Sequence, residues 1–317
     1  MNSVSASIPD KLVSRRSDAP PRQRRRGPRG TGSRLTYSAM ALPSLLLMIL
    51  VNAYPVFYAA MQSVHDGSLI SQGDFIGLDN YIAAASDSAF WAAAQFTIIF
   101  TLVGVFGSWL IGLSLALLLR TKIPGRAVFR VLLVLPWVVP VVVSATSWNW
   151  LTAQHDSPLP MLARALGMGD VLFLANPTLA VITVCAFKVW ISFPFMMMMM
   201  GAALEGIDPT VYEAARMDGA NSRQQLFGIT LPLIAKPTYI GWVLMTIFCV
   251  NDFPTIFLLT GGGPVNATTS MVVFAYRLVF LNFQTGYGVA IAFLMTILLV
   301  IVSVILYRQI RKVGNHE

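Results

Sequence analysis

Six apolar stretches, each long enough to cross a lipid bilayer as a helix, dominate this sequence. They cover approximately residues 37–62, 91–119, 131–151, 177–201, 237–260 and 288–308. A bilayer-spanning helix needs about 20 largely apolar residues, and its backbone must satisfy its hydrogen bonds inside the segment itself. The pattern therefore predicts an all-α membrane protein with six transmembrane helices.

The composition and the basic tail fit the same class. Hydrophobic residues make up 56% of the chain and charged residues only 11%, whereas soluble domains carry about 25% charged residues. The net charge of +8 is concentrated at the N-terminus, where nine of the 22 basic residues precede Leu35 in a stretch rich in Pro, Gly and Arg. We expect residues 1–36 to be a disordered cytoplasmic tail that contacts anionic lipid and binds no nucleic acid.

The positions of Lys and Arg predict the orientation in the membrane. The N-terminal tail, loops 120–130 and 202–236 and the C-terminal end together hold 19 of the 22 basic residues, whereas the opposite side holds Arg164 and Arg277. Loops with an excess of Lys and Arg stay on the cytoplasmic side. We therefore expect both termini to be cytoplasmic, with residues 311–317 forming a short tail.

One cytoplasmic segment, residues 208–236, carries signals for helix formation. Asp208 is placed to cap a helix whose first residue is Pro209, and Gly219 is suited to end it because glycine takes a positive φ without strain. Three small apolar residues share one face of this helix: Val211, Ala214 and Ala215. The two alanines would let another protein approach closely.

A second helix start follows the glycine. Its capping box is formed either by Asn221 with Gln224 or by Ser222 with Gln225. A connection between two spans would need far fewer residues and no such caps. The segment therefore predicts two short helices, hinged at a glycine, that dock on another protein rather than merely linking two spans.

The residues of this segment resemble the EAA loop of permeases from binding-protein-dependent ABC importers. The matching positions are Glu213-Ala214-Ala215, three residues, Gly219, nine residues, Ile229, one residue, and Leu231-Pro232. The wording YEAARMDGAN is similar to the carbohydrate-uptake branch. AYPVFYAAMQSV with FIGLDNY, and NDFPTIFLLTGGGPVNATTS, resemble maltose-type and glycerol-phosphate-type permeases, so that the resemblance covers residues 37–310. Pro254, inside the fifth span, departs from that pattern.

The resemblance implies the type I importer permease fold and a role in moving a sugar or sugar-like solute across a prokaryotic plasma membrane. It also implies four kinds of partner: a second, related permease, two cytoplasmic ATPase subunits, an extracytoplasmic binding protein and the lipid bilayer. The residues implied to couple this chain to the ATPase are Glu213, Ala214, Ala215, Asp218, Gly219, Ile229, Leu231 and Pro232.

The chain itself is not expected to be an enzyme. It contains no Gly-Lys dipeptide and therefore no P-loop that could cradle nucleotide phosphates. We expect ATP and Mg²⁺ to bind the partner ATPase, and we expect no catalytic residue, cofactor or metal site here. The stretch at Gly112-Leu113-Ser114 nearly resembles a serine nucleophile turn, but it lies within a span, and no histidine falls in any span to act as its base.

Two ionisable residues fall inside predicted spans, where such groups are usually functional. The helical rise places Lys188 about 16 Å and Asp252 about 12 Å from the same membrane face, so they either form an ion pair, share a water-lined cavity, or find separate partners. Sugars stack on rings and bind amides and carboxylates, which makes five residues candidates for the translocation path: Lys188, Trp190, Asn251, Asp252 and Asn149. Asn149 lies near the outer end of its span, a position that favours an interfacial anchor over the path.

An ion-coupled secondary carrier of a small polar solute is the alternative function. Such carriers usually hold several ionisable residues in their spans, and this chain has two. Six spans are few for that class, and a carrier would not need a capped pair of cytoplasmic helices. The sequence therefore favours the importer permease.

Overall fold

The protein is described by a computed structural model that covers residues 31–71, 73–121 and 124–313. Residues 1–30 of the predicted N-terminal tail (1–36) and residues 314–317 of the predicted C-terminal tail (311–317) lie outside this part. The chain divides into two compact units, one up to Pro55 and one from Val56 onward. Every regular element in the described ranges is a helix, and the one β pairing found there is an isolated bridge between His65 and Phe75.

Four helices are long and apolar enough to cross a membrane: α1 (Thr31–Ser63), α3 (Ser88–Arg120), α7 (Pro177–Glu205) and α14 (Thr285–Val313). Two bent pairs complete a set of up to six spans. The first joins α4 (Arg126–Val138) to α5 (Val141–Thr152) at 92°, and the second joins Ser222–Leu233 to α11 (Ala235–Val250) at 65°. Each of the six predicted apolar segments overlaps one of these units. The fifth overlaps only α11 of the second pair, because Ser222–Leu233 belongs to the segment predicted to be cytoplasmic.

The third and fifth segments are not the continuous helices that the hydropathy predicted. The third breaks at Val139 and Pro140, because proline has no N–H to continue α4 and instead stands at the start of α5. The fifth was predicted over 237–260, but α11 ends at Val250 and a separate helix, α12 (Phe253–Leu259), follows. Asp252 caps α12, and Pro254 lies in its first turn, where proline is favoured.

Helix boundaries differ from the prediction at both ends of the chain. Helix α1 begins at Thr31 rather than 37, and α14 continues to Val313 where a tail was expected from 311. Three shorter helices were not predicted: α2 (Asp79–Ser86), α6 (Pro158–Ala165) and α13 (Met271–Phe280). They are too short to produce a bilayer-length apolar run.

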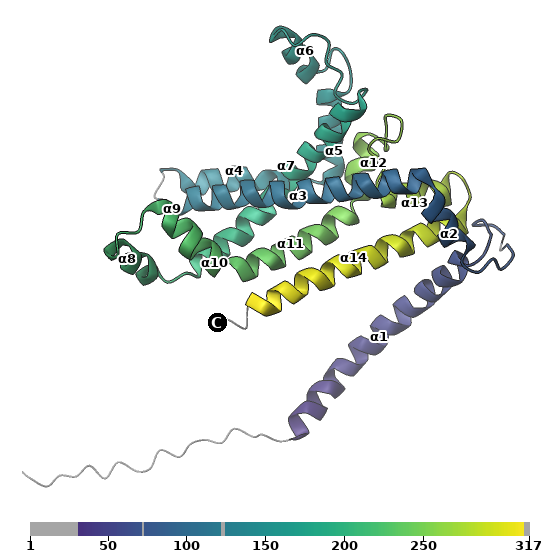
Figure 1. Cartoon of the computed structure of the whole chain (residues 1–317), viewed down its shortest axis with the longest axis horizontal. Helices are drawn as coiled ribbons and strands as arrows, with labels where there is room; N and C mark the ends of the chain where they lie inside the picture. Colours follow the sequence, from purple (N-terminus) through teal and green to yellow (C-terminus); the bar gives the residue numbers. More distant parts are fainter. Residues whose placement is uncertain (1–30, 72, 122–123, 314–317) are drawn as a thin grey trace, which may run out of the picture. The chain divides into compact units, whose positions relative to one another are not determined.

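Within the unit that begins at Val56, α3 and α7 run side by side, and α11 lies against both α3 and α14 (Figure 1). Glycines on α3 allow the close approach to α7. A Cβ added at Gly112 would lie 2.6 Å from the backbone nitrogen of Met197, and one added at Gly107 would lie 2.7 Å from a methyl carbon of Val189. Small residues at such crossings let helix backbones pack tightly in lipid.

The segment after α7 lies at one end of this bundle. Helices α8 (Pro209–Met217), α9 (Ser222–Gln225) and α10 (Leu231–Leu233) gather there, together with the C-terminal end of α14, whereas α2 and α13 lie at the opposite end (Figure 1). The predicted docking segment and the C-terminal end of α14 therefore lie on the same side of the bundle.

Candidate functional site

Helix α8 begins with the predicted cap. The Asp208 carboxylate accepts a hydrogen bond from the backbone N–H of Thr210 at 2.9 Å, and Pro209 occupies the first turn. This backbone hydrogen bond, with the further contact to Thr210, holds the pKa of Asp208 below its usual range. The ionised carboxylate also suits the positive end of the helix dipole.

Gly219 ends α8 in the left-handed conformation, with φ of +78°. The N–H of Gly219 donates to the carbonyl of Arg216 at 3.0 Å, and the N–H of Ala220 donates to the carbonyl of Ala215 at 2.9 Å. These two bonds form a Schellman motif, which closes the free carbonyl groups at a helix end. The predicted glycine hinge is therefore present and is fixed by hydrogen bonds.

Helix α9 starts with one of the two predicted capping boxes. The Asn221 side chain accepts from the N–H of Gln224 at 2.9 Å, and the Gln224 side chain accepts from the N–H of Asn221 at 2.8 Å. Gln225 instead donates to the carbonyl of Ala220. A π-helical turn, η1 (Leu226–Thr230), follows, and such turns occur frequently at functional sites.

The burial of the side chains on α8 differs from the prediction at one residue, Ala215. Tyr212 and Ala215 are buried within this chain, whereas Glu213 and Ala214 are exposed. The two alanines therefore do not form one exposed face, because Ala215 points toward the spans. Met217 is 88% exposed at the tip of α8.

Tyr212 anchors the segment to the spans. Its hydroxyl lies 3.0 Å from the hydroxyl of Thr230 in η1, and both groups are buried. The Arg120 guanidinium, at the end of α3, lies 4.6 Å from the centroid of the Tyr212 ring. The ring belongs to a core cluster whose other members come from α3, α7 and the chain that flanks α8 and α11, among them Leu113, Met200, Leu204, Ile207 and Ile234.

Tyr212 was not among the residues predicted for this segment, although the sequence holds a signal for it. Tyr212 and Ala215 stand three residues apart on a helix that is otherwise rich in charged and polar groups, and this spacing marks a buried face.

The remaining residues of the EAA pattern separate into two groups. Asp218 and Gly219 are exposed with Glu213 and Ala214, while Ile229 and Leu231 pack against the cluster and Pro232 is exposed behind them.

Of the arrangements that the sequence left open for Lys188 and Asp252, the structure shows the ion pair. Lys188 Nζ of α7 lies 2.7 Å from Asp252 Oδ2, and the two side chains are only 7% and 8% exposed. Lys188 also donates to the carbonyl of Phe248, near the end of α11, at 3.4 Å. The pair thus joins α7 to the break between α11 and α12.

The ion pair lines a cavity of about 330 Å³ between the two helix breaks. One side of the cavity comes from the junction of α4 and α5, and the other from the junction of α11 and α12. Asn251 lines it together with Lys188 and Asp252; the remaining lining residues include Trp137, Val139, Ile191, Ser192 and Phe248. Three of the five predicted path residues therefore meet at one cavity.

The other two predicted path residues make structural contacts instead. The Trp190 ring centroid lies 5.6 Å from that of Trp148 and 5.9 Å from that of Phe187, within the main core. The Asn149 amide donates to the carbonyl of Leu259 at 2.9 Å and so ties α5 to the end of α12. Among the described residues, neither of these two lines the cavity beside the ion pair.

Residues 108–314, which include the capped segment and the ion pair, match the sequence profile of the family described as "Binding-protein-dependent transport system inner membrane component". The chain belongs to this family. It is a multi-pass permease of the inner membrane, in agreement with the predicted localisation and with its apolar helices.

Several named permeases are similar to this permease over most of their length. The trehalose/maltose transport system permease protein MalF of Thermococcus litoralis is 34% identical over 274 residues, which cover 86% of this chain and 92% of that protein. The sulfoquinovosyl glycerol transport system permease protein SmoG of Agrobacterium fabrum is 30% identical, with coverage of 88% and 92%. The trehalose transport system permease protein SugA of Mycobacterium tuberculosis is also 30% identical, with coverage of 83% and 86%.

A solved structure shares the fold of the permease. The chain superimposes with a TM-score of 0.76 on a subunit of a bacterial ABC transporter involved in the import of the acidic polysaccharide alginate. The alignment covers 89% of this permease and 96% of that subunit, at 20% sequence identity. The type I importer permease fold that the sequence predicted is therefore confirmed.

Proposed function

We propose that this permease moves a sugar or sugar-like solute into the cell, driven by ATP that a separate ATPase subunit hydrolyses. The relatives described above are named for trehalose, maltose and a sulfosugar glycerol. One solved transporter of the same fold holds a periplasmic protein that carries an alginate pentasaccharide. The chain has no Gly-Lys dipeptide, so the nucleotide and its Mg²⁺ bind elsewhere.

The doubly capped pair of helices α8 and α9 is the observation that carries this proposal. Glu213, Ala214 and Gly219 face outward from a short rigid helix, where a groove on an ATPase subunit can take them. On the inner side, Tyr212 connects α8 to η1 and to the ends of α3 and α7. A displacement of α8 is therefore passed to the spans as a movement of packed elements rather than lost in a flexible loop.

The permease works in an assembly with a second, related permease, two ATPase subunits and an extracytoplasmic binding protein. Both termini and α8 face the cytoplasm in this proposal, because 19 of the 22 basic residues lie on that side. The binding protein delivers the solute to the opposite end.

The solute passes the cavity beside the ion pair. Asn251 and Ser192 offer groups that bind sugar hydroxyls, and the rings of Trp137 and Phe248, whose centroids are 6.3 Å apart, form an aromatic wall. Lys188 and Asp252 neutralise each other at 2.7 Å. This pairing speaks against an ion-coupled carrier, since neither group is left free to take up a coupling ion.

Uptake into proteoliposomes tests the proposal. The full-length permease, purified with the subunits that accompany it, is reconstituted with binding protein and a panel of labelled sugars. We expect uptake of at least one sugar to require ATP on the side of α8 and to be unaffected by collapsing proton and sodium gradients. Uptake driven by an ion gradient without ATP would overturn the proposal in favour of the carrier.

A further inference from the structure

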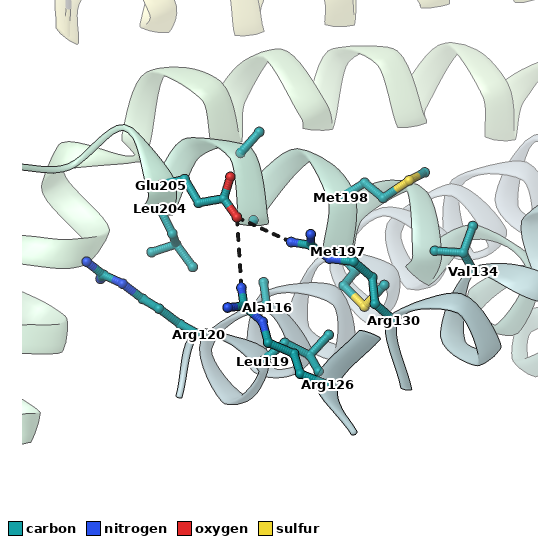
Figure 2. A pocket seen from close by; sticks show the side chains of 12 residues that line it. Ala116, Leu119, Arg120, Arg126, Arg130, Val134, Met197, Met198, Leu204 and Glu205 are labelled. Atoms are coloured by element: carbon teal, nitrogen blue, oxygen red, sulfur yellow. Dashed lines mark hydrogen bonds and ion pairs between the residues drawn. The ribbon is translucent and has the colours of Figure 1, made fainter. Parts of the chain in front are cut away.

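A second cavity lies apart from the ion pair, at the end of the bundle that holds α8. It has a volume of about 310 Å³ and is formed by the end of α3, the start of α4 and the end of α7 (Figure 2). We propose that this cavity binds the phosphate headgroup of an anionic phospholipid from the cytoplasmic leaflet. The choice of leaflet rests on the proposed orientation of the permease.

The charges around the cavity are unbalanced. Three arginines line it, Arg120, Arg126 and Arg130, against one acid, Glu205. Both Arg126 and Arg130 approach the same oxygen, Glu205 Oε1, at 3.9 Å and 3.3 Å. These long contacts between exposed groups contribute little on their own, and a single carboxylate cannot compensate three guanidinium groups.

The positions of the arginines leave donors for a further anion. Figure 2 shows Arg126 and Arg130 turned toward Glu205, while the Arg120 side chain extends away from that carboxylate. The Arg120 guanidinium lies 4.6 Å from the centroid of the Tyr212 ring, and Arg120 forms none of the ion pairs to Glu205. Helix α4 also begins here without a side-chain cap, and a helix start of this kind favours a negative charge. Arginine is the residue best suited to bind phosphate through paired N–H groups.

Most of the other residues that line the cavity are apolar, which favours a lipid over a free phosphate or a nucleotide. The apolar residues include Ala116, Leu119, Val134, Met197, Met198 and Leu204. Arginines combined with apolar side chains in one cavity, at the end of membrane helices, match a phosphate that carries acyl chains. A strongly hydrated anion such as free phosphate would gain no binding energy from those apolar side chains.

Lipid binding is measured on the full-length permease, purified with its accompanying subunits and placed in nanodiscs that contain phosphatidylglycerol or only phosphatidylcholine. Retained phosphatidylglycerol is counted by native mass spectrometry. We expect Arg126→Gln/Arg130→Gln to weaken retention by about tenfold or more, because each of the two basic residues near a membrane surface contributes roughly a fivefold factor. Arg164→Gln removes a comparable exposed arginine, one paired with Asp170, and we expect it to leave retention unchanged.

Two further variants separate a lipid site from an ion-pair cluster with a purely structural role. Glu205→Gln leaves the arginines without their acid, so a lipid site retains phosphatidylglycerol at least as well as the wild type, whereas a structural cluster loses stability in all these variants alike. A side chain added at Gly201 meets open space, and Gly201 lines the cavity. We expect Gly201→Leu to fill the cavity and to lower retention without removing a charge.

Three results would overturn the proposal. They are unchanged retention in Arg126→Gln/Arg130→Gln, displacement of the lipid by millimolar inorganic phosphate, and a loss of subunit assembly in Gly201→Leu without a change in retained lipid. The last would mean that another subunit covers the cavity. The orientation is tested separately by labelling the exposed position Ser222→Cys with a membrane-impermeant maleimide, so a failure of the proposed orientation is recognised independently of lipid binding.

Discussion

Lys188 Nζ lies 2.7 Å from Asp252 Oδ2, while Oδ1 of the same carboxylate accepts the N–H of Thr255 at 3.1 Å and caps α12. One side chain therefore closes an ion pair with α7 and also begins the helix that follows the break after α11. Removing two charges from water is costly, and the arrangement is favourable only while both partners are present. The pair is a specific link between α7 and the interrupted fifth segment.

Removing one partner of this pair should be far more damaging than removing both. We expect Lys188→Met alone to destabilise the permease by about 3–5 kcal/mol, because it leaves a buried carboxylate unpaired. The double variant Lys188→Met/Asp252→Asn should recover most of that loss, since asparagine keeps an oxygen that can cap α12. Unfolding of the purified assembly in detergent measures the difference. Equal losses in the single and double variants would contradict a direct pairing.

Gly219 should tolerate asparagine better than alanine. Its φ is +78°, and an added Cβ would meet no atom within 4 Å, so the penalty comes from the backbone conformation alone. We expect Gly219→Ala to cost about 1–2 kcal/mol in local stability and Gly219→Asn to cost less, because asparagine enters the left-handed region more readily. Amide exchange at the end of α8 measures this.

Gly228 provides the matched control for that comparison. It is also surrounded by open space but has no positive φ, so Gly228→Ala should leave exchange in α8 unchanged. Equal effects of alanine at both positions would show that the left-handed conformation of Gly219 is not what ends α8.

The sequence was sufficient for features that depend on neighbouring residues. The caps at Asp208 and Asn221, the turn at Gly219 and the apolar segments all follow from local backbone chemistry, and the structure has each of them. It was not sufficient where tertiary packing decides. The burial of Ala215 depends on which side of α8 meets α3 and α7, a direction that residue type alone does not specify.

The two interrupted spans show the same limit. Hydropathy averages over a window of membrane length and therefore does not register the change of helix direction at Pro140 or the helix break at Asp252. The similar depths of Lys188 and Asp252 in the membrane were predictable from the helical rise. Asn149 and Trp190, in contrast, were assigned to the translocation path only because of their residue types. Their hydrogen bond and ring contacts within the core could be known only from the fold.

Tyr212 should transmit movement rather than contact the ATPase. Tyr212→Ala removes the ring from the cluster at a cost of about 3–5 kcal/mol, yet Glu213 and Ala214 stay on the exposed face. We expect this variant to bind the ATPase with lower uptake per ATP hydrolysed. Tyr212→Phe loses only the hydrogen bond to Thr230, about 0.5–1.5 kcal/mol, and should keep most of the coupling. A complete loss of ATPase binding in Tyr212→Ala would instead assign the ring to the docking contact.

The start of α8 should loosen in acid. The pKa of Asp208 is lowered by its bond to the Thr210 N–H, so the cap stabilises α8 above the unfolded-state pKa and is lost as the pH falls through the folded-state pKa. We expect exchange of the Thr210 amide, corrected for its intrinsic pH dependence, to accelerate over that acid range. Asp208→Asn keeps an uncharged cap and should remove this dependence; a persisting acid effect would point to another group.

The most direct test of the coupling role compares sugar uptake and binding-protein-stimulated ATP hydrolysis in Glu213→Ala and Gly219→Asp with the wild-type assembly in proteoliposomes. Both residues are exposed on the capped segment, so each variant should fold and assemble with its partner subunits. The account predicts that both variants lose stimulated hydrolysis and uptake together. Normal uptake in either variant would contradict it and would reduce the segment to a connection between two spans.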